Sequence, residues 1–249
     1  MIFITGASSG IGAACARAFA AQGRALLLVA RRAEKLTTLK AELEAKAGLE
    51  VHALSLDVRD RAAVEAFSKQ YGGLLGRVSV LVNNAGLAKG MGPLDQGHLD
   101  DWDAMIDTNL KGLLYVTHAL LPLMRTRGSG HIVNLGSVAG HEVYPNGNVY
   151  CATKHAVRAL TQSLRMDLNG SGIRVTEISP GMVETEFSQV RLGDPAKAKA
   201  VYAGMSPLTP QDIAEAIVWR ISRPARVNIQ ELVIYPTDQA SPTVIARRN

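Results

Sequence analysis

The sequence predicts an α/β protein with a doubly wound parallel sheet of about seven strands and helices on both faces. Short apolar runs alternate with longer stretches of helical periodicity, and no linker or repeat divides the 249 residues. Repeated strand–helix units form parallel sheets, because right-handed crossovers place helices on both faces. We therefore expect one domain over residues 1–249.

Each expected strand is a short apolar run, and each expected helix has apolar residues at intervals of three and four. The run at residues 25–30 is continuous, which is typical of a strand buried on both faces. The expected strands are residues 2–4, 25–30, 51–56, 78–82, 131–135, 173–178 and 232–234. The expected helices are residues 11–21, 36–47, 61–71, 100–124, 149–168 and 211–221.

Several helix ends carry recognisable signals. Gly48 follows the helix 36–47, and Pro122 is expected to bend or end the helix 100–124. Thr209 and Pro210 supply an N-cap and a first-turn proline for the last helix. Residues of about 182–207 lack a clean pattern, so we expect them to form a mobile segment over a substrate site.

Composition excludes several classes of protein. The 27 Lys and Arg against 22 Asp and Glu give a net charge of +5, but no five like charges are consecutive. We therefore expect neither a nucleic-acid nor a membrane partner. Two cysteines, Cys15 and Cys151, imply no disulfide framework and a reducing compartment. Apolar residues and a glycine motif begin at once, leaving no room for a signal peptide, so we expect a cytoplasmic protein.

The first apolar run leads into a glycine-rich turn, Thr-Gly-Ala-Ser-Ser-Gly-Ile-Gly at residues 5–12. Glycines let the backbone turn tightly and approach a phosphate, and the helix that follows presents free amides to it. A plain glycine-rich turn is the alternative, but the position between a strand and a helix favours a dinucleotide. The expected contacts are Gly6, Ser8, Ser9, Gly10, Ile11 and Gly12.

The second expected strand is followed by two arginines, Arg31 and Arg32, where an acidic residue would bind the ribose of NAD. Arginine suits a 2′-phosphate, because its planar fork makes charge-assisted hydrogen bonds. A solvated helix start is the alternative interpretation. We therefore predict NADP(H) as the cofactor.

Asp57 follows the third strand, where it either accepts from the adenine amino group or caps the next helix.

Four further polar residues fall at positions that suit catalysis. Tyr150 and Lys154 are four residues apart, so they share one face of a helix. Ser137 follows the fifth strand, at the edge where α/β proteins bind ligands, and Asn109 lies inside the helix 100–124. Each residue alone is a weak signal, because such pairs and positions occur by chance.

Together with the glycine turn and the Asn-Asn-Ala-Gly motif at residues 83–86, these four residues resemble the short-chain dehydrogenase/reductase family. The resemblance runs from Thr5 to Thr185 and implies a Rossmann-type fold. It implies that Tyr150 is the general acid or base, and that Lys154 lowers the pKa of Tyr150 and bonds the nicotinamide ribose. Ser137 would hydrogen-bond the substrate oxygen, and Asn109 would hold a proton-relaying water. No metal is implied, because the cofactor carries the hydride.

The resemblance also assigns a larger set of residues to the cofactor cleft, and it implies a homotetramer formed through the two long helices. The cleft residues that it adds to the glycine turn and arginines are Asp57, Val58, Asn83, Ala85, Gly86, Tyr150, Lys154, Pro180, Gly181, Val183 and Thr185.

Residues 83–90, 102–109, 147–150, 185–191 and 227–236 resemble a narrower group, the NADP-dependent 3-hydroxy acid dehydrogenases. This implies a small substrate such as serine, L-allo-threonine or 3-hydroxypropionate. Arg191 is the candidate for the substrate carboxylate, with Tyr144 and Met182 as further pocket residues; a surface arginine and core packing are the alternatives. A broad ketone, aldehyde or 3-oxoacyl reductase is the alternative enzyme, and a non-catalytic dinucleotide sensor is the alternative of another class.

Overall fold

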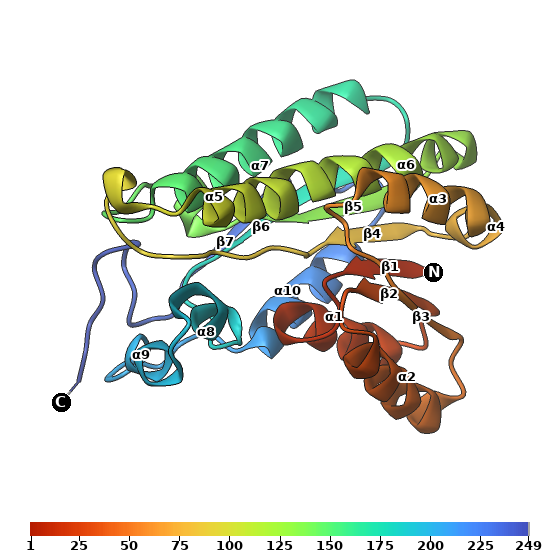
Figure 1. The fold of residues 1–249 in the computed structure, drawn as a ribbon. Helices are drawn as coiled ribbons and strands as arrows, with labels where there is room; N and C mark the ends of the chain where they lie inside the picture. Colours follow the sequence, from red (N-terminus) through yellow and green to blue (C-terminus); the bar gives the residue numbers. More distant parts are fainter. Residues whose placement is uncertain (249) are drawn as a thin grey trace.

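A seven-stranded parallel sheet lies at the centre of the molecule, with strands in the order β3-β2-β1-β4-β5-β6-β7 (Figure 1). The computed structural model describes residues 1–248. The predicted fold class is confirmed, and the strand bounds differ from the expected ranges by only a few residues. The strands are β1 (Ile2–Thr5), β2 (Leu26–Ala30), β3 (Val51–Ser55), β4 (Val80–Asn83), β5 (Gly130–Leu135), β6 (Ile173–Pro180) and β7 (Glu231–Ile234).

Helices cover both faces of the sheet (Figure 1). Alternate strand residues face opposite ways, so Ile2 and Ile4 of β1 join one apolar core while Phe3 joins the other. The continuous apolar run of β2 fits this arrangement, since both of its faces are buried. The core that contains Ile2 packs against α1 (Gly10–Ala20), α2 (Ala33–Ala47) and α10 (Pro210–Ile221). The core that contains Phe3 packs against α3 (Arg61–Gln70), α4 (Gly72–Leu75), α6 (Leu113–Arg127) and α7 (Asn148–Asp167).

The helix expected at residues 100–124 is built from three consecutive pieces. These are α5 (Leu99–Ile106), a π-helical stretch η2 (Asp107–Gly112) and α6 (Leu113–Arg127). Pro122 was expected to bend or end the helix; it lies inside α6, which continues to Arg127, so of these two effects the end is wrong. π-helical insertions are frequent at functional sites, and this one carries Asn109.

The segment 182–207 contains two short helices that periodicity does not reveal. They are α8 (Phe187–Leu192) and α9 (Pro195–Ala200), and each has six residues, less than two full turns. Asp194 caps α9 by accepting hydrogen bonds from the amides of Ala196 and Lys197. The remaining short elements are two 3₁₀ turns, η1 (Leu94–Gln96) and η3 (Val138–Gly140).

The predicted helix-end signals are present in the structure. Gly48 follows α2 in the left-handed conformation, at φ +57°. Thr209 and Asp212 form a reciprocal capping box at the start of α10. Across residues 1–248, none of the helices has the length and apolar character needed to cross a membrane.

Candidate active site

A cleft of about 350 Å³ runs along the carboxyl edge of the sheet, where ligands bind in open α/β folds. It brings together most of the residues singled out from the sequence. These are Gly6, Ser8, Ser9, Gly10, Ile11, Arg31, Arg32, Asp57, Val58, Ala85, Gly86, Ser137, Tyr150, Lys154, Pro180, Gly181, Val183 and Thr185.

Other expected site residues do not line this cleft: Gly12, Asn83, Asn109, Tyr144, Met182 and Arg191. The lining residues that sequence reasoning did not single out are Ala30, Leu56, Asn84, Leu87, Thr108, Leu135, Gly136, Glu186, Phe187 and Val190. Asn84 belongs to the Asn-Asn-Ala-Gly motif at residues 83–86, and Thr108 precedes Asn109. Their closeness in sequence to predicted site residues could therefore have indicated both. Glu186 and Val190 lie in the segment without a clean periodicity, and their available signal was the stretch 185–191 that resembles the 3-hydroxy acid dehydrogenases.

The glycine turn is held close to the strand β4 by Asn84. The Asn84 Nδ2 donates to the carbonyls of Thr5 at 2.9 Å and Gly6 at 3.2 Å. Gly6 has a φ of +65°, and a Cβ at Gly12 would lie 2.5 Å from the Asn84 Nδ2, so side chains at both positions are excluded. The turn therefore leaves the first amides of α1 facing the cleft, which fits a pyrophosphate. Gly12 does not line the cleft, and the absence of a side chain there lets Asn84 pack against the turn.

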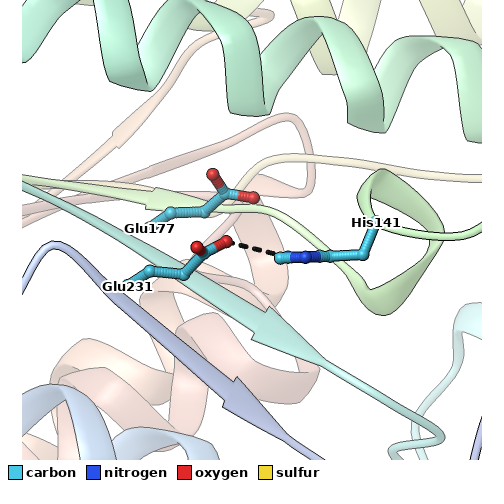
Figure 2. A group of neighbouring side chains, drawn as sticks. All are labelled: His141, Glu177 and Glu231. Carbon is cyan, nitrogen blue, oxygen red and sulfur yellow. Dashed lines mark ion pairs between the residues drawn. The ribbon is translucent and has the colours of Figure 1, made fainter.

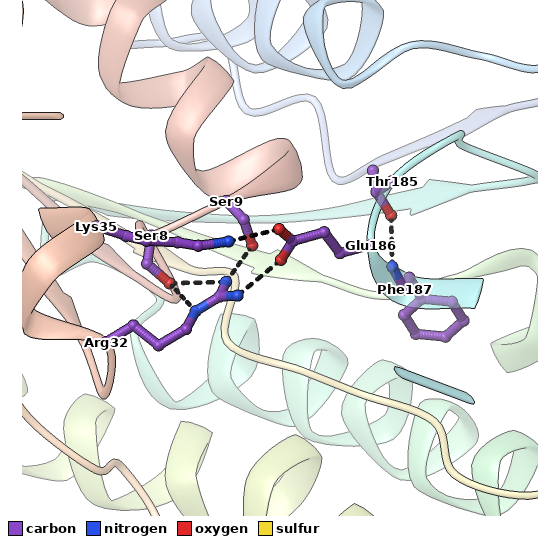
Figure 3. A network of polar contacts seen from close by, with 7 residues as sticks. All are labelled: Ser8, Ser9, Arg32, Lys35, Thr185, Glu186 and Phe187. Carbon is purple, nitrogen blue, oxygen red and sulfur yellow. Dashed lines mark hydrogen bonds and ion pairs between the residues drawn. The ribbon is translucent and has the colours of Figure 1, made fainter. Parts of the chain in front are cut away.

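Arg32 lies beside the glycine turn, at the end of the cleft where a 2′-phosphate would bind (Figure 3). Its Nε donates to the Ser8 hydroxyl at 3.2 Å, and its Nη2 donates to the Ser9 hydroxyl at 2.6 Å. Its Nη1 forms an ion pair with Glu186 Oε2 at 2.8 Å. Arg31 is exposed and lines the same cleft. The cleft is therefore lined by two arginines and two serines, whose donors fit a phosphate.

Asp57 lines the cleft, but it does not cap the next helix. Its carboxylate forms an ion pair with Arg59 at 2.6 Å, and hydrogen bonds from Arg59 hold the pKa of Asp57 below its usual range. Asp60 caps α3 instead, by accepting from the amide of Ala63 at 2.9 Å. The alternative role as a helix cap is therefore wrong.

The Asn83 side chain takes part in a buried polar network rather than in the cleft. Its Nδ2 donates to Thr117 Oγ1 and to Asn134 Oδ1, both at 2.9 Å. Asn134 in turn donates to Thr161 Oγ1 at 2.9 Å. The network ties β4 and β5 to α6 and α7, so Asn83 supports the sheet edge from within the core.

Tyr150, Lys154 and Ser137 meet at the centre of the cleft and are all buried. The Lys154 Nζ lies 5.9 Å from the centroid of the Tyr150 ring and donates to the Leu135 carbonyl at 2.7 Å. The Ser137 Oγ accepts from the amide of Ala139 at 3.1 Å, which fixes the hydroxyl at the end of β5. The sequence spacing of Tyr150 and Lys154 therefore places both on the same side of α7, as expected.

The electrostatics of the tyrosine differ from the expectation. Burial, the largest effect, raises the pKa of Tyr150, and the neighbouring Tyr144 raises it further, while Ser137 and Arg191 lower it. Burial also lowers the pKa of Lys154 to about 8. The expected lowering of the Tyr150 pKa by Lys154 is therefore not found. The physical reason is that desolvation of the phenolate outweighs the lowering of the pKa by Ser137 and Arg191.

Asn109 is buried behind the cleft and binds the chain at Leu87. Its Oδ1 accepts from the Leu87 amide at 2.8 Å, and its Nδ2 donates to the Leu87 carbonyl at 2.8 Å and to Thr153 Oγ1 at 3.1 Å. A Cβ at Gly86 would meet the Asn109 Oδ1 at 3.3 Å and the Lys154 Nζ at 3.7 Å. Asn109 thus fixes the cleft floor at Gly86 and Leu87, next to Lys154.

Arg191 reaches the site from α8. Its Nη1 donates to the Tyr144 hydroxyl at 2.9 Å, and its guanidinium carbon lies 5.6 Å from the centroid of the Tyr150 ring. Phe187 packs edge-on against Tyr150, with ring centroids 5.6 Å apart. Within residues 1–248, no ion pair joins Arg191 to a carboxylate. Met182 does not line the cleft, and its backbone amide donates to Gln239 Oε1 at 2.8 Å.

His141, Glu177 and Glu231 form a second cluster of titratable side chains (Figure 2), and their ligand atoms lie within 4.8 Å of one another. The His141 Nε2 faces the Glu231 Oε1 at 2.8 Å, and Arg158 lies 3.5 Å from the same oxygen. Glu177 accepts from the Ser179 hydroxyl at 2.9 Å, and its charge raises the pKa of Lys154 against the effect of burial. Burial lowers the pKa of His141 and raises the pKa of Glu177, so burial disfavours the charged form of both groups.

Comparison with known proteins points in one direction. A family model described as short chain dehydrogenase matches residues 1–194. Sulfoacetaldehyde reductase 2 of Chromohalobacter salexigens is 48% identical over 242 residues, which cover 96% of this chain and 95% of that protein. NADP-dependent 3-hydroxy acid dehydrogenase YdfG of Escherichia coli K12 is 46% identical over 242 residues, with 96% of both chains covered.

A solved structure is similar over the whole chain. The closed form of serine dehydrogenase complexed with NADP⁺ superimposes with a TM-score of 0.93 at 44% identity. The superposition covers 100% of this chain and 99% of that one. The family model, the curated relatives and the solved structure are therefore all dehydrogenases or reductases.

Proposed function

The chain belongs to the short-chain dehydrogenase family, and we propose that it transfers a hydride between NADP(H) and a small 3-hydroxy acid or 3-oxo acid. One observation carries the proposal. Arg191, with no carboxylate partner among residues 1–248, has its guanidinium carbon 5.6 Å from the centroid of the Tyr150 ring, and Tyr150 lines the cleft together with Ser137 and Lys154. A substrate with an anionic group a few atoms from its reacting oxygen fits this arrangement.

The preference for NADP(H) rests on the arginines beside the glycine turn. Arg31 and Arg32 line the cleft with Ser8 and Ser9, and Asp57 lies nearby, where the adenine would bind. The two residues that follow β2 are Arg31 and Arg32, where an acidic residue would accept from a ribose 2′-hydroxyl. Relatives named as NADP-dependent and as complexed with NADP⁺ support the same assignment.

The cofactor, when bound, supplies or accepts the hydride. Tyr150 remains a protonated phenol because burial raises its pKa, so it donates a proton to the substrate oxygen during reduction. Ser137 holds that oxygen by a hydrogen bond and so stabilises the negative charge that develops there. Lys154, fixed by the Leu135 carbonyl, places an ammonium at the cleft floor for the ribose hydroxyls.

Arg191 is the proposed anchor for the anionic end of the substrate, with Tyr144 holding its guanidinium in place. Tyr144 and Met182 stay candidates for shaping the pocket. The first assignment is a carboxylate. A sulfonate is the second candidate, because the relative at 48% identity is named as a sulfoacetaldehyde reductase and a guanidinium binds both anions by the same hydrogen bonds.

The experiment is a substrate panel run with the wild type and Arg191→Ala. The panel contains L-serine, 3-hydroxypropionate, a hydroxysulfonate, a simple alcohol and a 3-oxoacyl thioester, each with both cofactors. Loss of a charge-assisted bond of about 1.5–3 kcal/mol should raise KM for the anionic substrates by roughly 10- to 150-fold. KM for the simple alcohol should stay the same.

The matched control is Arg223→Ala. Arg223 also stacks on an aromatic ring, that of Trp219 at 5.0 Å, but it lies outside the cleft. Its removal should leave every KM unchanged. An unchanged KM for the anionic substrates in Arg191→Ala would contradict the anchor. Turnover of the thioester or the alcohol alone would instead support a broad ketone, aldehyde or 3-oxoacyl reductase.

We further propose that residues 1–249 form one domain in which segment 182–207 closes the substrate side, and that the protein is a cytoplasmic homotetramer. The shared sheet supports the first proposal. Exposed apolar side chains on the two long helices, Leu114 of α6 and Met166 of α7, support an interface there. Light scattering after gel filtration measures the mass, and a monomer would contradict the tetramer.

A further inference from the structure

Three consecutive residues of segment 182–207 reach three different parts of the cleft. Thr185 lies against the glycine turn, where a Cβ at Gly10 would meet it at 3.4 Å. Glu186 pairs with Arg32, and Phe187 packs against Tyr150. The Thr185 hydroxyl accepts from the Phe187 amide at 3.1 Å, so the turn is internally braced (Figure 3). The position of Glu186 is therefore tied to both ends of the site.

The Glu186 carboxylate is held by two cations and a hydroxyl. Its Oε1 lies 2.6 Å from Lys35 Nζ and its Oε2 lies 2.8 Å from Arg32 Nη1. Hydrogen bonds from Lys35 and Arg32, with a smaller effect from Ser9, lower the pKa of Glu186 to about 2. Glu186 thus presents a full negative charge to Arg32 across the physiological pH range.

This arrangement uses the same donors that a phosphate needs. Arg32 donates to Ser8 and Ser9 through its Nε and Nη2, and its Nη1 is paired with Glu186. A 2′-phosphate that binds Arg32 must take the Nη1 donor from Glu186, or stand close to a second anion. Like charges at such distances repel, so the two anions exclude one another at this guanidinium.

We propose that Glu186 competes with the 2′-phosphate of NADP(H) for the guanidinium of Arg32: its carboxylate, held by Arg32 and Lys35, is displaced from Arg32 when the cofactor binds. The inference rests on the proposed NADP(H) dependence and deepens it. Glu186 lowers affinity for ligands that carry a 2′-phosphate and leaves ligands without one unaffected. It thereby favours cofactor release and couples cofactor binding to the segment that carries Phe187.

The test measures binding by isothermal titration calorimetry in wild type, Glu186→Gln and Glu184→Gln. The probes are adenosine 2′,5′-bisphosphate and 5′-AMP, which differ only in the 2′-phosphate. Removing the competition of two partly exposed ion pairs should tighten bisphosphate binding to Glu186→Gln by about three- to tenfold, with 5′-AMP binding changed less than about twofold.

Glu184→Gln is the matched control, because it removes one charge from the same segment at a residue that does not line the cleft. It should bind both probes like the wild type. In an Arg32→Ala background, Glu186→Gln should give no gain. Bisphosphate binding to Glu186→Gln that is unchanged or weaker would overturn the proposal, and a weaker value would mean that Glu186 positions Arg32.

The wild-type titration tests the proposed function separately. If the wild type does not bind the bisphosphate more tightly than 5′-AMP, the preference for NADP(H) fails, whatever Glu186→Gln does. If the wild type shows the preference and Glu186→Gln shows no gain, only the competitor role of Glu186 fails. Thermal melting by circular dichroism checks that each variant is folded.

Discussion

Replacing Asn109 with alanine should destabilise the fold as well as damage the site. The Asn109 amide makes three buried hydrogen bonds, two to the Leu87 backbone and one to Thr153. Alanine keeps the helix but leaves the Leu87 amide and carbonyl without their partners. Leu87 is only 8% exposed, so water does not readily replace them.

The magnitude follows from the number of orphaned groups. An unsatisfied buried donor or acceptor costs about 1–3 kcal/mol, so two such groups lower the free energy of unfolding by roughly 2–6 kcal/mol. That is a large part of the 5–15 kcal/mol typical of native proteins. The floor formed by Gly86 and Leu87 should loosen, and turnover should fall with stability.

The assay is urea unfolding followed by circular dichroism. Asn148→Ala is the control, because the exposed Asn148 side chain makes two hydrogen bonds: its Nδ2 donates to the Gly92 carbonyl and its Oδ1 accepts from the neighbouring Val149 amide. The control should change the free energy of unfolding by less than about 1 kcal/mol. A similarly small change in Asn109→Ala, with turnover lost, would refute the anchoring account and favour a water relay alone.

Three further predictions concern chemistry, cofactor choice and pH. Tyr150→Phe should abolish turnover while cofactor binding, followed by fluorescence, stays intact; turnover near that of the wild type would remove Tyr150 as the proton donor. The double variant Arg31→Ala, Arg32→Ala should weaken NADPH far more than NADH in direct titrations, and equal losses would remove the 2′-phosphate assignment. Burial lowers the pKa of His131 from 6.5 to about 3, so the unfolded chain takes up a proton that the folded chain does not, and stability should fall as pH falls from about 6.5 to 3. In His131→Gln the free energy of unfolding should depend less on pH between about 6.5 and 3. A pH dependence like that of the wild type in this range would contradict the prediction.

The sheet and its main helices are predictable because each depends on local periodicity. The alternation of Ile2, Phe3 and Ile4 between two cores, and the glycine turn after β1, follow from residue order alone. The spacing of Tyr150 and Lys154 is equally local. These features place the cleft before any coordinates are known.

Other features depend on contacts between distant parts of the chain. Asn109, in the π-helical stretch, hydrogen-bonds to the backbone of Leu87, which lies 22 residues earlier in the chain. Hydrophobic periodicity does not predict such a long-range hydrogen bond. Asn83 belongs to a motif at the cleft edge, yet strand alternation turns its side chain into the core. Glu186 reaches Arg32 across 154 residues from a segment with no readable pattern.

The raised pKa of Tyr150 also depends on contacts between distant parts of the chain. A nearby lysine predicts a lowered pKa, but the direction depends on how deeply the phenol is buried. Burial depends on Phe187, Tyr144 and the closing segment, all brought together by the fold. Sequence reasoning therefore identifies the reacting groups more securely than their electrostatic balance.

The central claim is NADP(H)-dependent oxidoreduction of a small anionic hydroxy acid. Its most direct test is the initial rate of NADPH formation, by absorbance, when the protein is mixed with NADP⁺ and L-serine or 3-hydroxypropionate. The account predicts NADPH formation by the wild type, a much lower rate with NAD⁺, and none by Tyr150→Phe. A folded wild type that binds NADP⁺ and oxidises neither hydroxy acid would contradict it.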